Sequence, residues 1–152
     1  MSVEGVPRVT LRPVTPENEA AVRALKVGPD QEQFVADNAR SLEEGAAEEH
    51  AWIRAVYADD VPVGFVMMYI DADEGVYYVW RFMVGAAHQG CGYGRRAMEL
   101  LIEHVRGQPN AAEILLSHRP GDGGPERFYK KLGYLHTGKV VDEELEMRLA
   151  LD

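Results

Sequence analysis

Three glycines lie at alternate positions in the segment Gln89-Gly90-Cys91-Gly92-Tyr93-Gly94, just before a helix-like pattern. Glycine carries no side chain, so successive backbone N–H groups of such a loop can point at an anion. The dipole of a following helix would add positive potential at the same place. Arg95 and Arg96 oppose the usual preference for acids in a first helical turn, which favours a bound phosphate. The glycines alone also suit close packing of a strand on a helix.

Two well-known phosphate loops fit these residues poorly. A Walker A loop ends in Gly-Lys-Ser/Thr, whereas this loop continues as Gly94-Arg95-Arg96. Residues 92–97 satisfy the dinucleotide pattern GxGxxG/A, but that fold needs an acid about 20 residues further on, at the end of the next strand. Glu113 has the distance but precedes the apolar run that it should follow. We therefore expect an anion other than a nucleoside triphosphate or a dinucleotide.

Alternation and helical periodicity predict the elements that hold this loop in place. Short turn-forming separators between the central strands indicate antiparallel hairpins. The order βααβββαβαβ predicts one α+β domain over residues 1–152, with a mixed, mostly antiparallel twisted sheet flanked by helices. The expected strands are 9–13, 52–58, 64–70, 76–84, 114–116 and 145–151, and the expected helices begin at Thr15 and Asp30 and span 95–106 and 126–132.

Two motifs in register resemble the GNAT acetyltransferase superfamily. Met83-Val84, four further residues and then Gln89-x-x-Gly92-x-Gly94 are similar to its acyl-CoA signature, Q/R-x-x-G-x-G/A. The segment Phe128-Tyr129-Lys130-Lys131-Leu132-Gly133-Tyr134 is similar to its FYxxxGF signature and follows at the family's usual distance. The resemblance covers residues 77–134 and implies an enzyme that transfers acetyl from acetyl-CoA directly to an amine in a ternary complex.

The resemblance also implies a role for each matching residue. Backbone N–H groups from Gly90 to Arg95 would hold the pyrophosphate, and the strand before the loop would splay from residues 114–117 to pair with pantetheine. The N–H near Val84 would polarise the thioester carbonyl, and Tyr129 would protonate the leaving thiolate. The implied cofactor-binding residues are Phe82, Met83, Val84, Gln89, Gly90, Cys91, Gly92, Tyr93, Gly94 and Arg95.

The sequence departs from the family pattern at two places. Many members carry an asparagine that contacts the cofactor seven residues before the tyrosine, where this chain has Asp122. A carboxylate accepts hydrogen bonds but cannot donate them, so that contact is in doubt. Many members also carry a glutamate before the loop that acts as a base through water, and residues 79–82 contain no carboxylate.

The acceptor is expected to be a primary amine, which must lose a proton before it attacks. Acids such as Glu32, Asp37, Asp73 and Glu74 could attract it, and aromatic rings could bind it by cation–π contact. Residues 31–44 resemble the bacterial diamine and polyamine acetyltransferase branch, which implies spermidine or spermine. Other amines, such as a drug or a peptide N-terminus, and a non-catalytic acyl-CoA-binding module are alternatives. The substrate-binding candidates are Glu32, Trp52, Tyr77 and Trp80.

The amino-acid composition disfavours several classes of binding partner. A net charge of −9 disfavours nucleic acid and is compatible with a cationic small molecule. No apolar run approaches the ~20 residues of a membrane helix, and the N-terminus does not resemble a signal peptide. The single cysteine excludes an internal disulfide and fits a cytoplasmic protein. The five histidines show no ligand spacing along the chain, so no metal site is expected. The sequence does not decide whether two copies of the chain form a homodimer.

Overall fold

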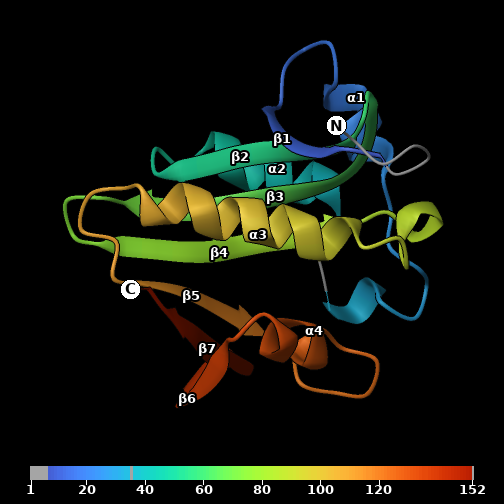
Figure 1. The fold of residues 1–152 in the computed structure, drawn as a ribbon. Coiled ribbons are helices and arrows are strands. Elements are labelled where there is room, and N and C mark those ends of the chain that lie inside the picture. The colour runs from blue at the N-terminus through green and yellow to red at the C-terminus, as the bar shows by residue number, and fades with distance from the viewer. Residues whose placement is uncertain (1–6, 35, 152) are drawn as a thin grey trace.

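The computed structural model describes residues 7–34 and 36–151, which form one seven-stranded sheet in the order β1-β2-β3-β4-β5-β7-β6 (Figure 1). Only β4 and β5 run parallel, and the other neighbouring strands are antiparallel. The strands are β1 (Val9–Pro13), β2 (Ala51–Ala58), β3 (Val61–Asp71), β4 (Val76–Val84), β5 (Glu113–His118), β6 (Leu135–Val141) and β7 (Glu144–Ala150). The helices are α1 (Glu19–Ala24), α2 (Asn38–Ala46), α3 (Tyr93–Arg106) and α4 (Glu126–Lys131), with 3₁₀ turns η1 (Glu32–Phe34) and η2 (Ala86–His88).

Helices cover both faces of the β1–β4 half of the sheet. In Figure 1, α3 lies in front of the strands and α1 and α2 lie behind them. Met98, Leu101, Ile102 and Val105 of α3 recur at helical spacing and are buried against the sheet, as their sequence pattern predicts. The opposite face packs Val22 of α1 and other apolar side chains in a second cluster. No helix in the described part of the chain is both long and apolar enough to span a membrane.

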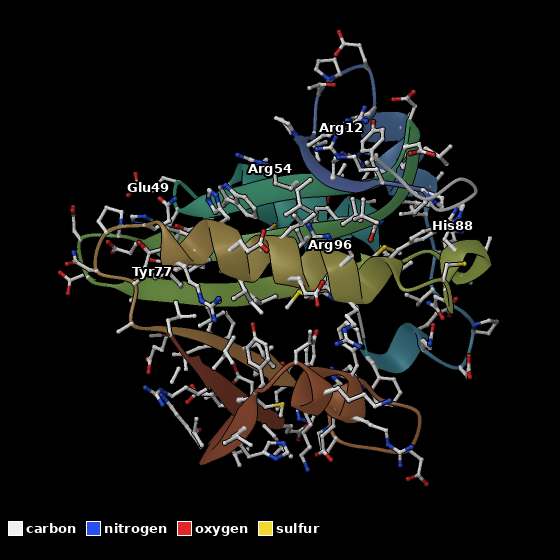
Figure 2. All side chains as sticks on the ribbon, viewed as in Figure 1. Arg12, Glu49, Arg54, Tyr77, His88 and Arg96 are labelled. Atoms are coloured by element: carbon white, nitrogen blue, oxygen red, sulfur yellow. The ribbon has the colours of Figure 1, made fainter. Side chains whose placement is uncertain are left out.

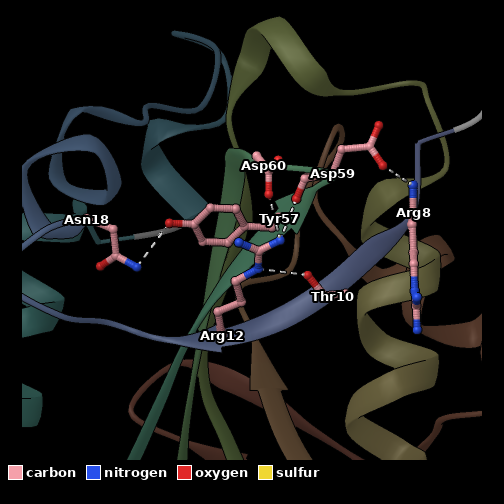
Figure 3. Close-up of polar contacts among 7 residues, drawn as sticks. All are labelled: Arg8, Thr10, Arg12, Asn18, Tyr57, Asp59 and Asp60. Atoms are coloured by element: carbon pink, nitrogen blue, oxygen red, sulfur yellow. Dashed lines mark hydrogen bonds and ion pairs between the residues drawn. The ribbon is translucent and has the colours of Figure 1, made fainter.

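In addition to its pairing with β2, β1 is tied by Arg12 to the turn that joins β2 to β3. The Arg12 guanidinium donates to the backbone oxygen of Asp59 at 2.8 Å and pairs with Asp60 at 3.3 Å, in the turn that joins β2 to β3 (Figure 3). It also lies over the Tyr57 ring, 4.2 Å from the centroid. Asn18 donates to the Tyr57 hydroxyl at 3.1 Å, so the same ring anchors the start of α1. These contacts place α1 and the segment after it over one end of the sheet.

A β-bulge in β4 changes which side chains face each helix layer. Arg81 pairs with Met67 and Val79 with Met68, which leaves Trp80 as the extra residue. Before the bulge, Val79 faces the α3 side; after it, Phe82 packs on that side instead of Arg81. A bulge also bends its strand and increases the local twist. In the described residues, β4 pairs with β5 only at Tyr78 and Val79, so the strands diverge from the bulge onward.

The predicted element order omitted one strand. The last part of the chain is a hairpin of β6 and β7, so the observed order is βααβββαβαββ. Every residue of β6 is exposed, because this strand lies at the edge of the sheet, although His136 contacts Glu126 of α4. Its sequence therefore lacks the alternation that marks a half-buried strand. Asp142 and Glu143 join the two strands, both with positive φ, as a two-residue hairpin turn requires.

Two predicted helix starts were also wrong. The first helix begins after Asn18, and Thr15 to Glu17 form a preceding turn. The second predicted helix is split into η1 and α2, and Asp37 caps α2 by accepting from the backbone N–H of Arg40 at 2.8 Å. This true N-cap lies seven residues after Asp30, the cap expected from the sequence. The remaining helices and strands agree with the predicted ranges to within three residues at each end.

Gly64 tests how tightly β3 and β4 are packed. A Cβ at this position would lie 2.5 Å from the backbone oxygen of Met83, which cannot move without displacing β4. We expect Gly64→Ala to lower the free energy of unfolding by about 2 kcal/mol in urea titrations. Gly107→Ala is the matched control, since its Cβ would meet nothing closer than 3.7 Å. Equal stability of the two variants would contradict the close approach.

Candidate functional site

The divergence of β4 and β5 opens a cavity of about 780 Å³. One wall is the second half of β4 and the loop 88–95, and the other is formed by Ser117, His118 and Arg119 at the end of β5. The α4 residues Phe128 and Tyr129 line its floor, and η1 lies across from the loop that precedes α4. Phe34 of η1 packs against Gly121 and Gly124 of that loop, so the cavity is bounded on this side too.

The glycines of loop 89–94 have two different roles. Gly90 and Gly92 adopt φ values of +81° and +83°, which L-residues with side chains rarely adopt, and a Cβ at either would meet nothing within 4 Å. Their backbone is therefore open to a ligand. A Cβ on Gly94 would instead lie 3.4–3.5 Å from Val84, Phe82 and Phe128, so this glycine allows close packing. Close packing is thus confirmed at Gly94, while anion binding at Gly90 and Gly92 stays a prediction that their open backbone permits.

Gln89 holds the loop against the end of β4. Its side-chain amide donates to the backbone oxygen of Val84 and to the Gln31 side chain, each at 2.8 Å. The next residues turn into α3, whose N-cap, Gly92, has no side-chain cap. The first N–H groups of a helix lack intrahelical partners, so this end of α3 can donate to an anion in the cavity.

The two arginines after the loop have partners within α3. Arg95 pairs with Glu99 at 3.5 Å, and Arg96 pairs with Glu99 at 3.6 Å and with Glu103 at 3.8 Å. Acids one and two turns later therefore offset the unfavourable position of these cations in the first turn. Arg95 lines the cavity, whereas Arg96 and Cys91 line a neighbouring groove beside β1 and β2. The need for a bound phosphate, inferred from the arginines, is weaker than the sequence suggested.

Tyr129 is buried in the cavity wall by aromatic neighbours. Its ring packs edge-on against Phe128 at 5.4 Å and Tyr134 at 5.9 Å, and Phe128 stacks on Phe82 of β4 at 5.9 Å. Burial raises the pKa of Tyr129 well above its usual range, so the phenol keeps its proton at neutral pH. Within the described residues its hydroxyl has no hydrogen-bond partner. The phenol is available to a ligand.

A chain of polar groups lies where β4 and β5 part. The Tyr78 hydroxyl contacts Ser117 Oγ, and Ser117 donates to Glu144 Oε1 at 3.0 Å. Ser117 and Glu144 line the cavity. Among the described residues the cavity has two carboxylates, Glu144 and Glu32. The chain thus provides a carboxylate from β7, although residues 79–82 of β4 contain none.

Two of the arginines that line the cavity share one acid. Arg81 pairs with Oε2 of Glu44 and Arg40 with Oε1, each at 3.0 Å. Arg81 is held in this position because the bulge turns it to the same side as Trp80, toward α2. Glu44 therefore compensates much of the positive charge on this wall of the cavity.

The structure separates the predicted acceptor residues. Glu32 and Trp80 line the cavity, but Trp52 and Tyr77 do not. Tyr77 is 1% exposed and donates to the Pro109 backbone oxygen at 2.6 Å; Figure 2 places it at the opposite end of α3 from His88, a cavity residue. Trp52 stacks on His104 at 4.8 Å and lines the groove beside β1. Both side chains serve packing, as expected of aromatic residues on a sheet.

The other acidic residues considered from the sequence do not line the cavity. Asp122, at the position of the family's asparagine, is exposed and does not line the cavity. Asp37 caps α2, and Asp73 and Glu74 lie in the turn between β3 and β4. Sequence reasoning missed Phe34, Ser117 and Glu144, because no local motif marks them and tertiary pairing alone brings them to the cavity.

Comparisons with known proteins agree with this geometry. The model of the acetyltransferase (GNAT) family matches residues 26–134. A spermine/spermidine N(1)-acetyltransferase of Bacillus subtilis is 28% identical over 140 residues, which cover 87% of this chain and 91% of that protein. An acetyltransferase of Thermus thermophilus superposes with a TM-score of 0.76 at 17% identity, covering 96% and 99% of the two chains. The aminoglycoside acetyltransferase AAC(6')-Ib in complex with coenzyme A gives 0.77 at 18%, covering 94% and 95%.

Proposed function

The chain belongs to the acetyltransferase (GNAT) family and is an N-acetyltransferase that uses acetyl-CoA; from this premise we propose that its acceptor is a diamine or polyamine such as spermidine or spermine. The observation that carries the proposal is the carboxylate of Glu144, held by Ser117 in the cavity wall beside the divergence of β4 and β5. The name of the Bacillus subtilis relative supports the same class of acceptor.

The residues of the second half of β4, the loop 89–94 and the start of α3 fit acetyl-CoA, the acetyl donor. This cofactor supplies a thioester for the amine to attack. The open backbone at Gly90 and Gly92 leaves room for a pyrophosphate next to the start of α3. Beyond Val79 the β4 backbone is not paired with β5, so Phe82, Met83 and Val84 can offer strand-like hydrogen bonds to pantetheine. A backbone N–H near Val84 would stabilise the negative charge that develops on the carbonyl oxygen.

Tyr129 is proposed as the general acid. Its raised pKa keeps the phenol protonated until a thiolate forms beside it. The stacked Phe82 and Phe128 rings hold α4, and with it Tyr129, against β4. Its hydroxyl is not among the fully buried polar atoms that lack a partner, so it reaches the cavity, where among the described residues it has no hydrogen-bond partner. A ligand sulfur would provide that partner.

Glu144 is proposed to attract the ammonium ion and accept its proton. A primary amine has a pKa near ~10.4, so at neutral pH it arrives charged and must be deprotonated before attack. Ser117 orients the carboxylate by donating to one of its oxygens, which leaves the other for the amine. Glu32, exposed at the mouth, adds a second negative charge for a substrate with more than one ammonium group.

Gly92→Ala tests the pyrophosphate loop. Its Cβ would enter the open space beside the start of α3, so we expect the Kd for CoA, measured by calorimetry, to rise about tenfold or more. Gly138→Ala on β6 is the matched control, with a φ of +91° and nothing within 4 Å. Both variants should lose about 1 kcal/mol of stability from the strained backbone, but only Gly92→Ala should weaken CoA binding. Equal CoA affinity in both would argue against this loop.

Tyr129→Phe tests the acid. We expect kcat, followed by release of free CoA, to fall about 100-fold or more, because the leaving thiolate loses its proton donor. The Kd for CoA should change by less than about threefold, since the ring and its packing are retained. A variant that turns over at the wild-type rate would remove Tyr129 from the mechanism.

An amine panel combined with Glu144→Gln tests the acceptor. We expect kcat/KM for spermidine and spermine to exceed that for butylamine or a peptide N-terminus, and Glu144→Gln to lower it about 100-fold at pH 7.5. Part of that loss should be recovered at higher pH, where more of the amine is already neutral. Glu146→Gln is the matched control, because Glu146 accepts from Thr137 on β6 and does not line the cavity. Turnover of another amine without any turnover of polyamines would overturn the substrate class, and an unimpaired Glu144→Gln would overturn the base.

A further inference from the structure

Two histidines and a glutamate from three elements converge at the first turn of α4. His118 lies at the end of β5, Glu126 in the first turn of α4, and His136 on β6. Their ligand atoms all lie within 4.8 Å of one another. The three residues lie within 18 positions of one another but match no local zinc-ligand motif, so their spacing along the chain did not reveal this cluster.

The distances are close to those of a zinc site. Zn²⁺ binds imidazole nitrogen at 2.0–2.1 Å and carboxylate oxygen at 2.0–2.2 Å, so tetrahedral ligands lie about 3.3–3.5 Å apart. Here the Nε2 atoms of His118 and His136 are 3.0 Å apart, and His136 Nε2 is 3.3 Å from Glu126 Oε1. The third pair, His118 with Glu126, has its ligand atoms within 4.8 Å, so α4 would move toward β5 by about 1 Å to accommodate the ion.

Neighbouring groups orient the ligand atoms of His118 and Glu126 toward the cluster. Nδ1 of His118 lies 3.2 Å from the Arg119 backbone oxygen; donation there leaves Nε2 with a free lone pair toward the cluster. Glu126 Oε2 pairs with Lys130 at 3.4 Å, which directs Oε1 to His136. His118 is 4% exposed, while the side chains of His136 and Glu126 are 29% and 45% exposed, so an ion can enter from solvent.

We propose that His118, Glu126 and His136 bind a Zn²⁺ ion, with water as the fourth ligand. Without metal, a proton must lie between the two facing imidazole nitrogens, and the ion replaces it. Two nitrogens and one carboxylate are a common protein ligand set for zinc. The ion joins β5, α4 and β6, and α4 carries Tyr129. Zinc therefore fixes the position of α4, and this role does not depend on which amine is acetylated.

The test uses the full chain without an affinity tag, treated with chelator, and zinc ion alone as the probe. Cys91→Ser is the background, because the exposed thiol could bind zinc independently. Calorimetry should show one ion per chain with a Kd of about 1 μM or tighter. Excess zinc should raise the melting temperature by about 5 °C. Cobalt should give the visible absorption of a four-coordinate site.

His136→Gln and Glu126→Gln identify the ligands. Both residues are partly exposed, so the variants should fold, with the metal-free melting temperature of the background protein. Each should weaken zinc binding at least tenfold and remove most of the thermal shift. His50→Gln is the matched control, since His50 is 33% exposed and pairs with Glu49 and Asp71 but belongs to no such cluster. The proposal is overturned if the background protein binds no zinc below about 100 μM, or if His136→Gln binds it as tightly as His50→Gln.

Discussion

The β-bulge at Trp80 is the feature on which the site depends. One extra residue in β4 turns Trp80 and Arg81 to the α2 side and Phe82 to the α3 side, and pairing with β5 stops at the residue before it. A regular strand would have continued the parallel ladder and closed the sheet. The bulge instead leaves backbone groups of β4 available and opens the cavity beside them, so the binding surface is made by interrupting the sheet.

The parts around this opening are held by contacts between distant segments. Phe82 after the bulge stacks on Phe128, which sets the place of α4 and the buried Tyr129. Gly94 allows the start of α3 to approach the same two rings, and Gln89 joins the loop to the last residue of β4. The loop, the start of α3, the end of β4 and α4 are therefore packed as one unit, and Gly94 is the glycine that allows the close approach.

The C-terminal hairpin contributes more than an edge to the sheet. Its inner strand, β7, pairs with β5 along the whole of that strand and brings Glu144 to Ser117. Its outer strand, β6, is exposed throughout, yet it places His136 beside His118 and Glu126. The carboxylate proposed to receive the amine and two of the proposed zinc ligands thus come from the same pairing of β5, β7 and β6, and His118 belongs both to the cavity wall and to the cluster.

The sequence by itself determined the family, the fold class, most elements and two of the segments that line the cavity, because the loop 89–94, α3 and the aromatic segment 128–134 are local patterns. The buried row of α3 could be read from periodicity, since this helix has one apolar face, and the strand of residues 76–84 from the turn-forming residues that precede it. Tertiary structure alone decided the rest. The bulge depends on the register between β3 and β4, and β6 has no apolar face by which to recognise it. Trp52 and Tyr77 are aromatic like the side chains of amine-binding sites, but here they pack within the fold. Glu144 reaches Ser117 through the pairing of β5 with β7, and His118, Glu126 and His136 meet because β7 lies between β5 and β6, next to the start of α4.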